Sequence, residues 1–236
     1  MHKIDVCLSP DLLHLYEIKD RIVVVTDVLR ATSCMTAGIA TGVDHIVPVS
    51  TLEECIELGK QGYVTAAERN GDKVEGFDIG NSPFSYMEPH MKGNKVAVTT
   101  SNGTIAINKS RDAVQVVIGS FLNLSAVAGY LREQGRDLLV LCAGWKGKVN
   151  LEDSLFAGAL VQALESTHAS ECDAPLMASR LYDLAKGDML AFMKDSSHVQ
   201  RLQRLGISKD IGYCLTPDQF DVIPVLSGDR IIALPS

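Results

Sequence analysis

The sequence lacks the motifs of the commonest phosphatase and hydrolase sites, and each absence excludes a class of active site. No cysteine has an arginine six positions later, which excludes the tyrosine-phosphatase loop. Neither Asp-x-Asp nor Arg-His-Gly occurs, which excludes the haloacid-dehalogenase nucleophile pair and the histidine phosphatases. GxGxxG, Walker A, HExxH and GxSxG are missing as well. Any catalysis therefore needs a less common set of residues.

Cysteines and histidines are few and scattered. The six cysteines have neither CxxC nor metal-ligand spacing, and the six histidines stand apart, so each histidine is expected to be an ordinary surface or core residue. No apolar run of the signal-peptide type follows Met1-His2-Lys3. These features predict a cytoplasmic protein with reduced thiols.

Basic residues are in the minority, with 22 lysines and arginines against 29 acidic residues and a formal net charge of −7. A nucleic-acid-binding protein would show a clustered basic face, so no nucleic-acid partner is expected. An anionic ligand would have to be held by local positive groups, a metal ion or helix N-termini against the overall field.

One uncharged stretch, residues 113–131, is about long enough to span a bilayer. It divides into a β-branched run, Val114–Ile118, a break at Gly119-Ser120 and a helical pattern. This division predicts a buried strand followed by a core-facing helix, and no membrane partner is expected.

Apolar runs alternate with helical patterns along most of the chain. After the alternating segment Ile4–Leu8, strands are predicted at Ile22–Thr26, His45–Val49, Tyr63–Ala67, Lys95–Val98, Ala113–Ile118 and Asp137–Cys142. Helices are predicted at Thr32–Thr41, Leu52–Gln61, Gly103–Lys109 and Phe121–Gln134. The runs are apolar throughout, as in strands buried on both faces. The pattern predicts an α/β fold, layered α/β/α, with a largely parallel or mixed central sheet.

The C-terminal third is predicted to be a helical segment followed by a β-hairpin. A long helix is expected at Leu151–Glu165, then a polar break at Ser166–Pro175 and shorter helices between Leu176 and Gly206. The segment 221–234 is typical of a hairpin that turns at Ser227-Gly228-Asp229.

No linker or repeat divides the 236 residues, of which 46% are hydrophobic and sufficient for a core. A single domain, 1–236, is therefore expected, in which residues 166–210 could form a helical cap or subdomain.

Ligands of open α/β sheets bind beyond the carboxyl ends of the strands, and four turns there are unusually polar. The first turn, Asp27–Ser33, follows a buried strand and contains Asp27, Arg30, Thr32 and Ser33. An Asp and an Arg before two hydroxyls that open a helix suit a metal ion together with an anion. The ordinary alternative is an N-cap with a salt-bridged Asp27.

The second turn begins with Glu68-Arg69 and leads to Gly80-Asn81-Ser82-Pro83. The charged pair could be structural. Ser82 and Pro83 are typical of a helix start, whether or not Asn81 touches a ligand.

The third and fourth turns concentrate hydrogen-bond donors and carboxylates. Thr99-Thr100-Ser101-Asn102-Gly103-Thr104 opens a helix where backbone N–H groups also point. Cys142-Ala143-Gly144 precedes Glu152-Asp153 at the start of the next helix. These carboxylates are either dipole complements or part of a Mg²⁺ site.

Together the four turns place carboxylates, arginines and a donor-rich helix start on one rim. Hard carboxylate oxygens suit Mg²⁺ rather than zinc, and arginine forks and helix N-termini suit phosphate. The residues alone thus indicate a metal-dependent enzyme that acts on a small phosphorylated acid.

In their order along the chain, these motifs resemble the 2-phosphosulfolactate phosphatase family. The resemblance is carried by Asp27-Val28-Leu29-Arg30-Ala31-Thr32, Glu68-Arg69, Gly76-Phe77-Asp78-Ile79-Gly80-Asn81-Ser82-Pro83, Thr99-Thr100-Ser101-Asn102-Gly103-Thr104, and Cys142-Ala143-Gly144 with Glu152-Asp153 and Ala157-Gly158. It covers residues 4–160 and is looser in the C-terminal third. Ala67 stands where a glycine is expected, and Cys34 where a second hydroxyl is usual.

The resemblance implies Mg²⁺-dependent hydrolysis of 2-phospho-3-sulfolactate to 3-sulfolactate and phosphate, in some organisms a step towards coenzyme M. Catalytic residues are expected at Asp27, Arg30, Glu68, Arg69 and Asp153. The expected metal ligands are Asp27, Glu68, Glu152 and Asp153. The expected substrate-binding residues are Thr32, Ser33, Asn81, Ser82, Thr100, Ser101, Asn102, Gly103, Thr104, Cys142 and Gly144.

In the resulting hypothesis, Arg30 and the start of the helix at Asn102 bind phosphate, and Arg69 meets the sulfonate or carboxylate. Water polarised by the metal attacks in line with a carboxylate as base. Covalent attack by Asp27 is an alternative, and attack by Cys142, which lacks an arginine cradle, is a third.

Two other functions fit the same residues. One is a general phosphatase of small phosphorylated hydroxy acids, and the other is a non-catalytic binder of an anionic metabolite. Retention of all the carboxylates and both arginines disfavours the binder. A homodimer, the commonest oligomer, is retained as an expectation.

Overall fold

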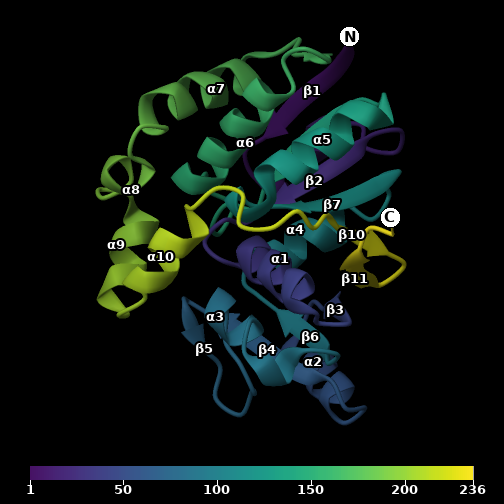
Figure 1. Cartoon of the computed structure of the whole chain (residues 1–236), viewed down its shortest axis with the longest axis vertical. Coiled ribbons are helices and arrows are strands. Elements are labelled where there is room, and N and C mark those ends of the chain that lie inside the picture. The colour runs from purple at the N-terminus through teal and green to yellow at the C-terminus, as the bar shows by residue number, and fades with distance from the viewer. Residues whose placement is uncertain (236) are drawn as a thin grey trace.

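The computed structural model describes residues 1–235 and shows one twisted sheet with helices on both faces (Figure 1). The strands are β1 (His2–Cys7), β2 (Ile22–Thr26), β3 (His45–Pro48), β4 (Val64–Arg69), β5 (Asp72–Lys73), β6 (Lys95–Thr99), β7 (Gln115–Gly119), β8 (Leu138–Cys142), β9 (His168–Ala169), β10 (Pro224–Ser227) and β11 (Arg230–Ala233). The α-helices are α1 (Ala31–Thr41), α2 (Leu52–Gly59), α3 (Pro83–Tyr86), α4 (Gly103–Lys109), α5 (Leu124–Gln134), α6 (Leu151–Ala163), α7 (Asp173–Ala185), α8 (Met189–Phe192), α9 (Ser197–Arg204) and α10 (Ser208–Cys214). Short 3-10 helices are η1 (Pro10–Leu15), η2 (Pro89–Met91) and η3 (Phe121–Asn123).

The C-terminal hairpin lies in the middle of the sheet. From edge to edge the strand order is β5-β4-β6-β3-β11-β10-β7-β2-β8-β1-β9. Strands β4, β6 and β3 pair in parallel, and so do β7, β2, β8, β1 and β9. The hairpin β10–β11 pairs antiparallel with β7 on one side and with β3 on the other. The predicted hairpin thus joins two parallel blocks.

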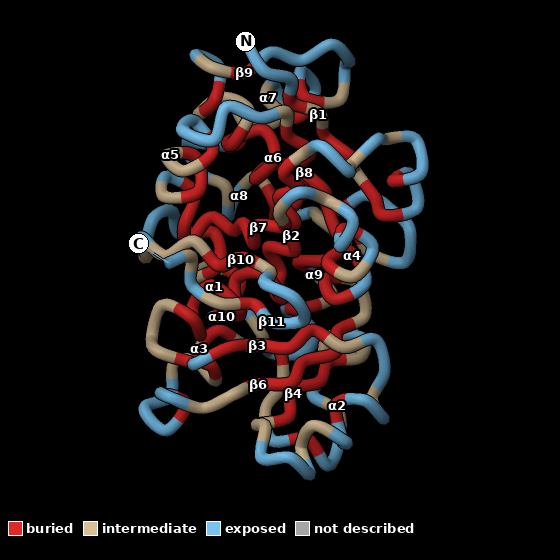
Figure 2. The backbone as a smooth tube through the Cα atoms, turned by 90° about the vertical axis from the view of Figure 1, so that its right-hand side faces the viewer, coloured by how far each residue is buried: buried red, intermediate tan, exposed pale blue. Residues whose placement is uncertain are grey.

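Strand β2 shows how the sheet is buried on both faces. Ile22 and Val24 belong to a core cluster with residues of α5, α6 and α7, whereas Val23 and Val25 belong to a second cluster with residues of α1 and α4. Alternate side chains of a strand point to opposite faces, so each face of β2 has its own helical layer. This confirms the predicted α/β/α layering, and Figure 2 shows the buried backbone running through the strands.

One predicted boundary is wrong for a definite reason. The strand expected to end at Ala67 continues to Arg69 and pairs antiparallel with β5. The connection is Asn70-Gly71, whose φ angles of 57° and 99° suit a two-residue hairpin turn. Glu68 and Arg69 therefore lie on a strand rather than in a loop.

The predicted polar break at Ser166–Pro175 is also shorter than expected. Strand β9 pairs in parallel with β1, and α7 begins at Asp173. Pro175 lies in the first turn of α7, where a backbone N–H has no intrahelical acceptor, so proline does not delay the helix.

Residues 166–210 pack into the same core as the sheet. Ala178 of α7 and Val199 of α9 belong to the cluster that contains Val24, as does Ile211 of α10. Helices α8, α9 and α10 lie along the left side of Figure 1, and α9 and α10 approach the region where several strands end.

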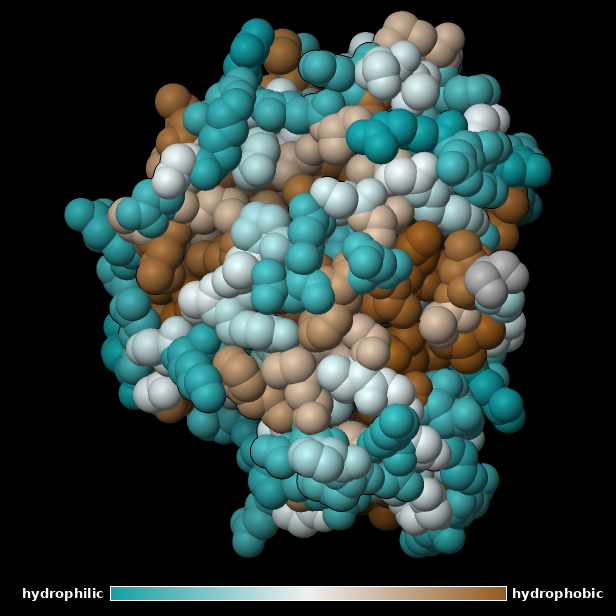
Figure 3. All heavy atoms as spheres, in the orientation of Figure 1, coloured by the Kyte–Doolittle hydropathy of each residue, from teal (hydrophilic) through white to brown (hydrophobic). Residues whose placement is uncertain are grey.

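The hairpin carries partly buried apolar residues beside the core, including Ile223, Ile232 and Leu234. Figure 3 shows an apolar area over this part of the molecule on an otherwise mixed face.

The uncharged stretch 113–131 folds as the sequence predicts. It contains β7, η3 and the first part of α5. Within residues 1–235, no helix combines the length and the apolar character that crossing a membrane requires.

Gly158 allows helices α6 and α7 to pack closely, and this generates the first prediction. A Cβ at this position would lie 2.0 Å from the carbonyl oxygen of Ala178. We expect Gly158→Ala to lower the free energy of unfolding by about 3 kcal/mol, at the upper end for overpacking, as measured by urea denaturation.

The matched control is Gly129→Ala in α5, where an added Cβ would meet nothing within 4 Å. Alanine has the higher helix propensity, so this change should stabilise the protein by up to about 1 kcal/mol. Equal effects at the two positions would show that the α6–α7 approach imposes no constraint.

Candidate active site

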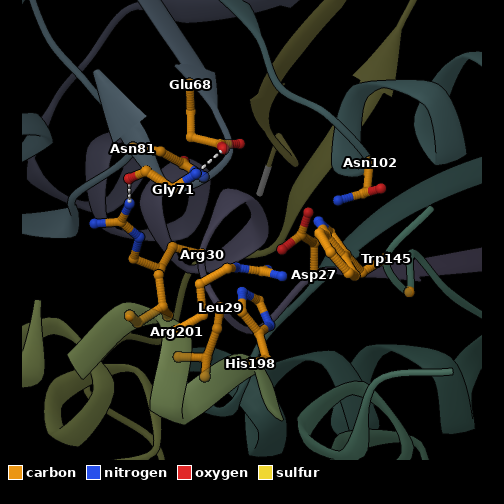
Figure 4. Close-up of a pocket in the computed structure, with 12 residues that line it drawn as sticks. Asp27, Leu29, Arg30, Glu68, Gly71, Asn81, Asn102, Trp145, His198 and Arg201 are labelled. Carbon is orange, nitrogen blue, oxygen red and sulfur yellow. Dashed lines mark hydrogen bonds between the residues drawn. The ribbon is translucent and has the colours of Figure 1, made fainter. Parts of the chain in front are cut away.

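A cavity lies where strands of both parallel blocks end. It is lined by Asp27, Leu29, Arg30, Glu68, Gly71, Asn81, Asn102, Gly144, Trp145, His198, Arg201 and Leu202. Figure 4 shows Asp27, Arg201 and His198 on one side of the space, Glu68 and Gly71 across from them, and Asn102 at the far end.

The four turns singled out by the sequence all contribute to this cavity. Asp27 follows β2, Glu68 lies near the end of β4, Asn102 follows β6 and Gly144 follows β8. The two blocks are related through three antiparallel pairings, so their carboxyl ends would point apart in a flat sheet. Neighbouring strands rotate by roughly 20–25°, and the accumulated twist turns the two sets of ends towards each other.

The β2–α1 turn is built to hold Asp27. The backbone N–H of Asp27 donates to Thr32 Oγ1 at 3.0 Å, and Ser33 Oγ donates to the Val28 carbonyl at 2.8 Å. Thr32 and Ser33 are therefore occupied within the turn and do not line the cavity. The Oδ1 atom of Asp27 accepts the Ala31 N–H at 3.3 Å, whereas Oδ2 accepts no hydrogen bond from the described residues.

Asp27 is an unusually basic carboxylate. Its side chain is almost fully buried, and this desolvation is the main cause that raises its pKa from 3.8 to about 6. The Glu68 and Glu152 carboxylates raise this pKa further, while His198 and the Ala31 N–H lower it. Asp27 can thus gain or lose a proton near neutral pH.

Asp153 is a structural carboxylate behind the cavity. Its Oδ1 accepts the Val28 N–H at 2.9 Å, and its Oδ2 accepts the Gly144 N–H at 3.0 Å. These bonds tie the turn after β2 to the turn after β8. Burial, Glu152 and Asp27 raise the pKa of Asp153 well above its ordinary value.

Glu152 is fully buried and binds His198. Its Oε1 lies 2.5 Å from His198 Nδ1, and its Oε2 has no hydrogen-bond partner among the described residues. The Nε2 atom of His198 forms no hydrogen bond within residues 1–235. A buried carboxylate therefore orients an imidazole whose second nitrogen is available at the cavity.

The charge of Arg30 is already neutralised. Its Nη1 lies 2.6 Å from Asp210 Oδ2, and its Nη2 donates to the Gly71 carbonyl at 2.7 Å. Ser82 Oγ donates to the other Asp210 oxygen at 3.1 Å, so Ser82 supports this ion pair rather than lining the cavity. Arg30 borders the cavity with its guanidinium committed to protein partners.

Glu68 and Asn81 form the wall on the β4 side. Glu68 accepts the Gly71 N–H through Oε1. Asn81 is buried, and its Oδ1 has no partner among the described residues. Both residues line the cavity.

Arg69, expected to meet the substrate, is not brought to the cavity. Its Nη1 donates to the carbonyls of Glu68 and Thr99, and its Nη2 donates to Thr99 Oγ1 at 3.1 Å. It therefore holds β4 against β6 and does not line the cavity.

The hydroxyls of the third turn are used internally. Thr104 N–H donates to Thr100 Oγ1, and Thr100 N–H donates to Thr104 Oγ1. Neither threonine lines the cavity, and Ser101 borders a neighbouring hollow together with Asn102 and Lys146.

Asn102 and Gly103 bring this turn to Asp27. Asn102 lines the cavity and accepts the Lys146 N–H through Oδ1 at 3.1 Å. A Cβ at Gly103 would lie 2.7 Å from both Asp27 Oδ2 and Ala31 Cβ. Glycine is required there because the β6–α4 turn packs directly on the β2–α1 turn.

In the fourth turn, Gly144 and Trp145 reach the cavity but Cys142 does not. Cys142 is the last residue of β8 and is buried in the core, and burial raises the pKa of its thiol well above the ordinary value. Because its thiol is buried and protonated, Cys142 has neither the position nor the ionisation of a nucleophile.

Gly144 is required in this turn by its backbone. It has a φ of 59°, and a Cβ there would lie against the Lys148 carbonyl oxygen.

Sequence reasoning missed the contribution of α9. His198 and Arg201 are three residues apart on this helix and line the cavity together. This i, i+3 spacing was a readable sign of a shared face. Their neighbour in the cavity, Trp145, is the only tryptophan of the sequence.

The family can be assigned directly. A family model described as 2-phosphosulpholactate phosphatase matches residues 7–229. The chain belongs to this family. A protein of Caldanaerobacter subterraneus named probable 2-phosphosulfolactate phosphatase is 41% identical over 215 residues, which cover 89% of each chain. Proteins with the same name from Thermotoga petrophila and Clostridium botulinum (strain Eklund 17B) are 38% identical over 94% of this chain and 95% of the relative, and 33% identical over 98% and 100%.

The two departures from the expected pattern of the 2-phosphosulpholactate phosphatase family lie away from the cavity. Ala67 is buried on β4 with Cys55 and Phe77, and Cys34 is buried in α1. Neither residue lines the cavity, so both changes affect packing and leave its charged groups in place.

The raised pKa of Asp27 predicts a pH-dependent stability. Ionisation of Asp27 costs more in the folded state, so stability present below pH 3.8 is lost as the pH rises through 6, by up to about 3 kcal/mol. Asp27→Asn removes this loss and keeps an oxygen for the Ala31 N–H. Urea unfolding in EDTA should show that the free energy of unfolding of the variant rises relative to that of wild type between about pH 4 and about pH 8.

The control is Asp20→Asn, at an exposed carboxylate before β2. Its effect should be small and nearly independent of pH. If the Asp27→Asn difference were equally flat, the carboxyl group of Asp27 would not be desolvated as described.

Proposed function

We propose that the protein is a phosphoric monoester hydrolase that converts 2-phospho-3-sulfolactate to 3-sulfolactate and phosphate. The observation that carries the proposal is the cavity itself, which brings together the carboxylates of Asp27 and Glu68 and the basic side chains of His198 and Arg201. Acidic and basic groups in one enclosed site suit an anionic ester that must be bound and also attacked. The choice of 2-phospho-3-sulfolactate as the substrate is supported by the name of the family and of the relatives.

Mg²⁺ is part of this proposal. Among residues 1–235, no group of three or more His, Cys, Asp or Glu side chains is arranged to hold a metal ion. Mg²⁺ at phosphate sites is commonly held by one or two carboxylates, waters and the substrate, and Asp27 and Glu68 fit that form. Asp153 does not, because backbone N–H groups occupy both its oxygens. When bound, the ion would withdraw charge from the phosphoryl group.

The residues of the chain divide the remaining tasks. The amides of Asn81 and Asn102 offer hydrogen bonds to phosphoryl oxygens. Water attacks phosphorus in line, and a cavity carboxylate takes its proton. Glu152 accepts a hydrogen bond from the Nδ1–H of His198 and fixes the ring, so that the Nε2–H of the imidazolium gives its proton to the departing alkoxide oxygen and a neutral imidazole remains. Direct attack by Asp27, forming an aspartyl-phosphate, is the alternative chemistry.

The setting of the reaction is also proposed. All six cysteines are unpaired within the described residues, which supports a cytoplasmic enzyme with reduced thiols. In a host that makes coenzyme M, the reaction would belong to that pathway, an assignment supported by the family resemblance.

The deciding assay measures phosphate release from 2-phospho-3-sulfolactate, 2-phospholactate and 3-phosphoglycerate, in Mg²⁺ and in EDTA. We expect rapid, Mg²⁺-dependent release from the first ester and a loss of orders of magnitude in Asp27→Asn. Equal rates on all three esters would make the protein a general phosphatase of small hydroxy acids. No release from any ester would contradict an enzymatic function.

A leaving-group comparison tests the role of His198. His198→Gln should slow hydrolysis of an alkyl phosphate by about 100-fold or more, the usual worth of general acid catalysis. It should slow p-nitrophenyl phosphate far less, because that leaving group departs without a proton. The exposed His90, changed to Gln, is the control. An equal loss on both esters would show that His198 does not protonate the leaving group.

A further inference from the structure

Arg201 occupies a distinctive position among the arginines near the cavity. It projects from α9 into the cavity, and its guanidinium carbon lies 4.0 Å from the ring centroid of Trp145 (Figure 4). Stacking on an indole holds the plane of a guanidinium and leaves its edge free to donate. Arg201 is thus oriented by an aromatic ring rather than by a carboxylate.

The positive charge of Arg201 is not neutralised by an ion pair within the described residues. Arg30 is paired with Asp210 at 2.6 Å, whereas Arg201 has no carboxylate oxygen within 4.0 Å in the described part of the chain. The Nε of Arg201 is buried without a hydrogen-bond partner among residues 1–235. A buried donor without a partner costs free energy, which a bound anion would recover.

The carboxylates of Glu68 and Glu152 favour the charged form of Arg201, although neither forms an ion pair with it. Burial lowers the pKa of Arg201, and Glu68 and Glu152 raise it. In a protein of net charge −7, this unpaired guanidinium is the local positive group that an anionic ligand needs.

We propose that Arg201 is the specificity-determining residue of the site, which binds the second anionic group of the substrate, its sulfonate or carboxylate. The proposal rests on the proposed function and concerns selection among phosphate esters rather than the chemistry at phosphorus. A planar fork can donate two parallel hydrogen bonds to two oxygens of one acid group. Trp145 is the positioning residue that sets the plane of this fork.

The test compares kcat/KM for 2-phospho-3-sulfolactate with that for glycerol 2-phosphate, which has the same secondary ester but no second acid group. Arg201→Met keeps an apolar stem against Trp145 and removes the charge. We expect it to lower kcat/KM for phosphosulfolactate by about 10-fold to 100-fold, mainly through KM, and to change glycerol 2-phosphate less than about threefold.

The matched control is Arg204→Met, which removes the same charge from an exposed position on the same helix. It should leave the preference between the two esters unchanged. Arg201→Lys should restore only part of the preference, because an ammonium group lacks the fork. Equal losses on both esters in Arg201→Met would overturn the proposal and place Arg201 at the phosphate.

Trp145→Leu provides a second route if Arg201→Met fails to fold. Without the indole, Arg201 keeps its charge but loses its orientation, so the preference for phosphosulfolactate should fall several-fold. An unchanged preference in Trp145→Leu would contradict the positioning role of the stack.

Calorimetric titration with 3-sulfolactate distinguishes failure of the proposed reaction from failure of the role proposed for Arg201. This compound carries the sulfonate and the carboxylate but no phosphate. Should wild type hydrolyse no ester, the proposed reaction fails, and Arg201 is judged by binding alone. Weaker 3-sulfolactate binding in Arg201→Met, but not in Arg204→Met, would support the anion-binding role. Equal binding by wild type and Arg201→Met would overturn it.

Discussion

The site depends on three carboxyl groups, Asp27, Glu152 and Asp153, that are buried close together where β2 and β8 end. Such a cluster is costly unless each group finds a partner or keeps its proton. Asp153 is stabilised by two backbone N–H groups, Glu152 by an imidazole and Asp27 by one N–H. These solutions also fix the loops after β2 and β8 and the orientation of α9. The positions of the groups around the cavity thus depend on the hydrogen bonds that these buried carboxyl groups form.

Much of the layered fold could be predicted because its signals are local. The run of β2 is apolar at nearly every position, and burial of such a run on both faces follows directly. The hairpin turn at Ser227-Gly228-Asp229 could also be read from the chain. Its insertion between β3 and β7 could not, because pairing partners distant in sequence leave no mark on local periodicity. The same reason hid β9, whose two residues are strand only because β1 lies beside them.

All four polar turns contribute residues to the cavity, but many of their side chains hydrogen-bond the backbone of their own turn. The sequence predicts that Thr32, Thr100 and Thr104 bind substrate, because hydroxyls near a helix start can bind an anion. In the folded chain, each of them hydrogen-bonds the backbone of its own turn. Residue type predicts the capacity to form a hydrogen bond, and tertiary packing decides which partner is used. His198 and Arg201 illustrate the reverse case, because only the docking of α9 gives them a role.

The central hairpin has a consequence for the order of assembly. Asp27 and Gly144 belong to one parallel block and Glu68 and Asn102 to the other, and β10–β11 supplies the strand pairing that joins the two blocks into one sheet. Residues 224–233 are made after every other strand of the sheet. On the ribosome, each block can collapse with its own helices while the sheet remains in two pieces. The sheet can therefore be closed only after the C-terminal hairpin has been made, and the two walls of the cavity belong to one continuous sheet only from that point.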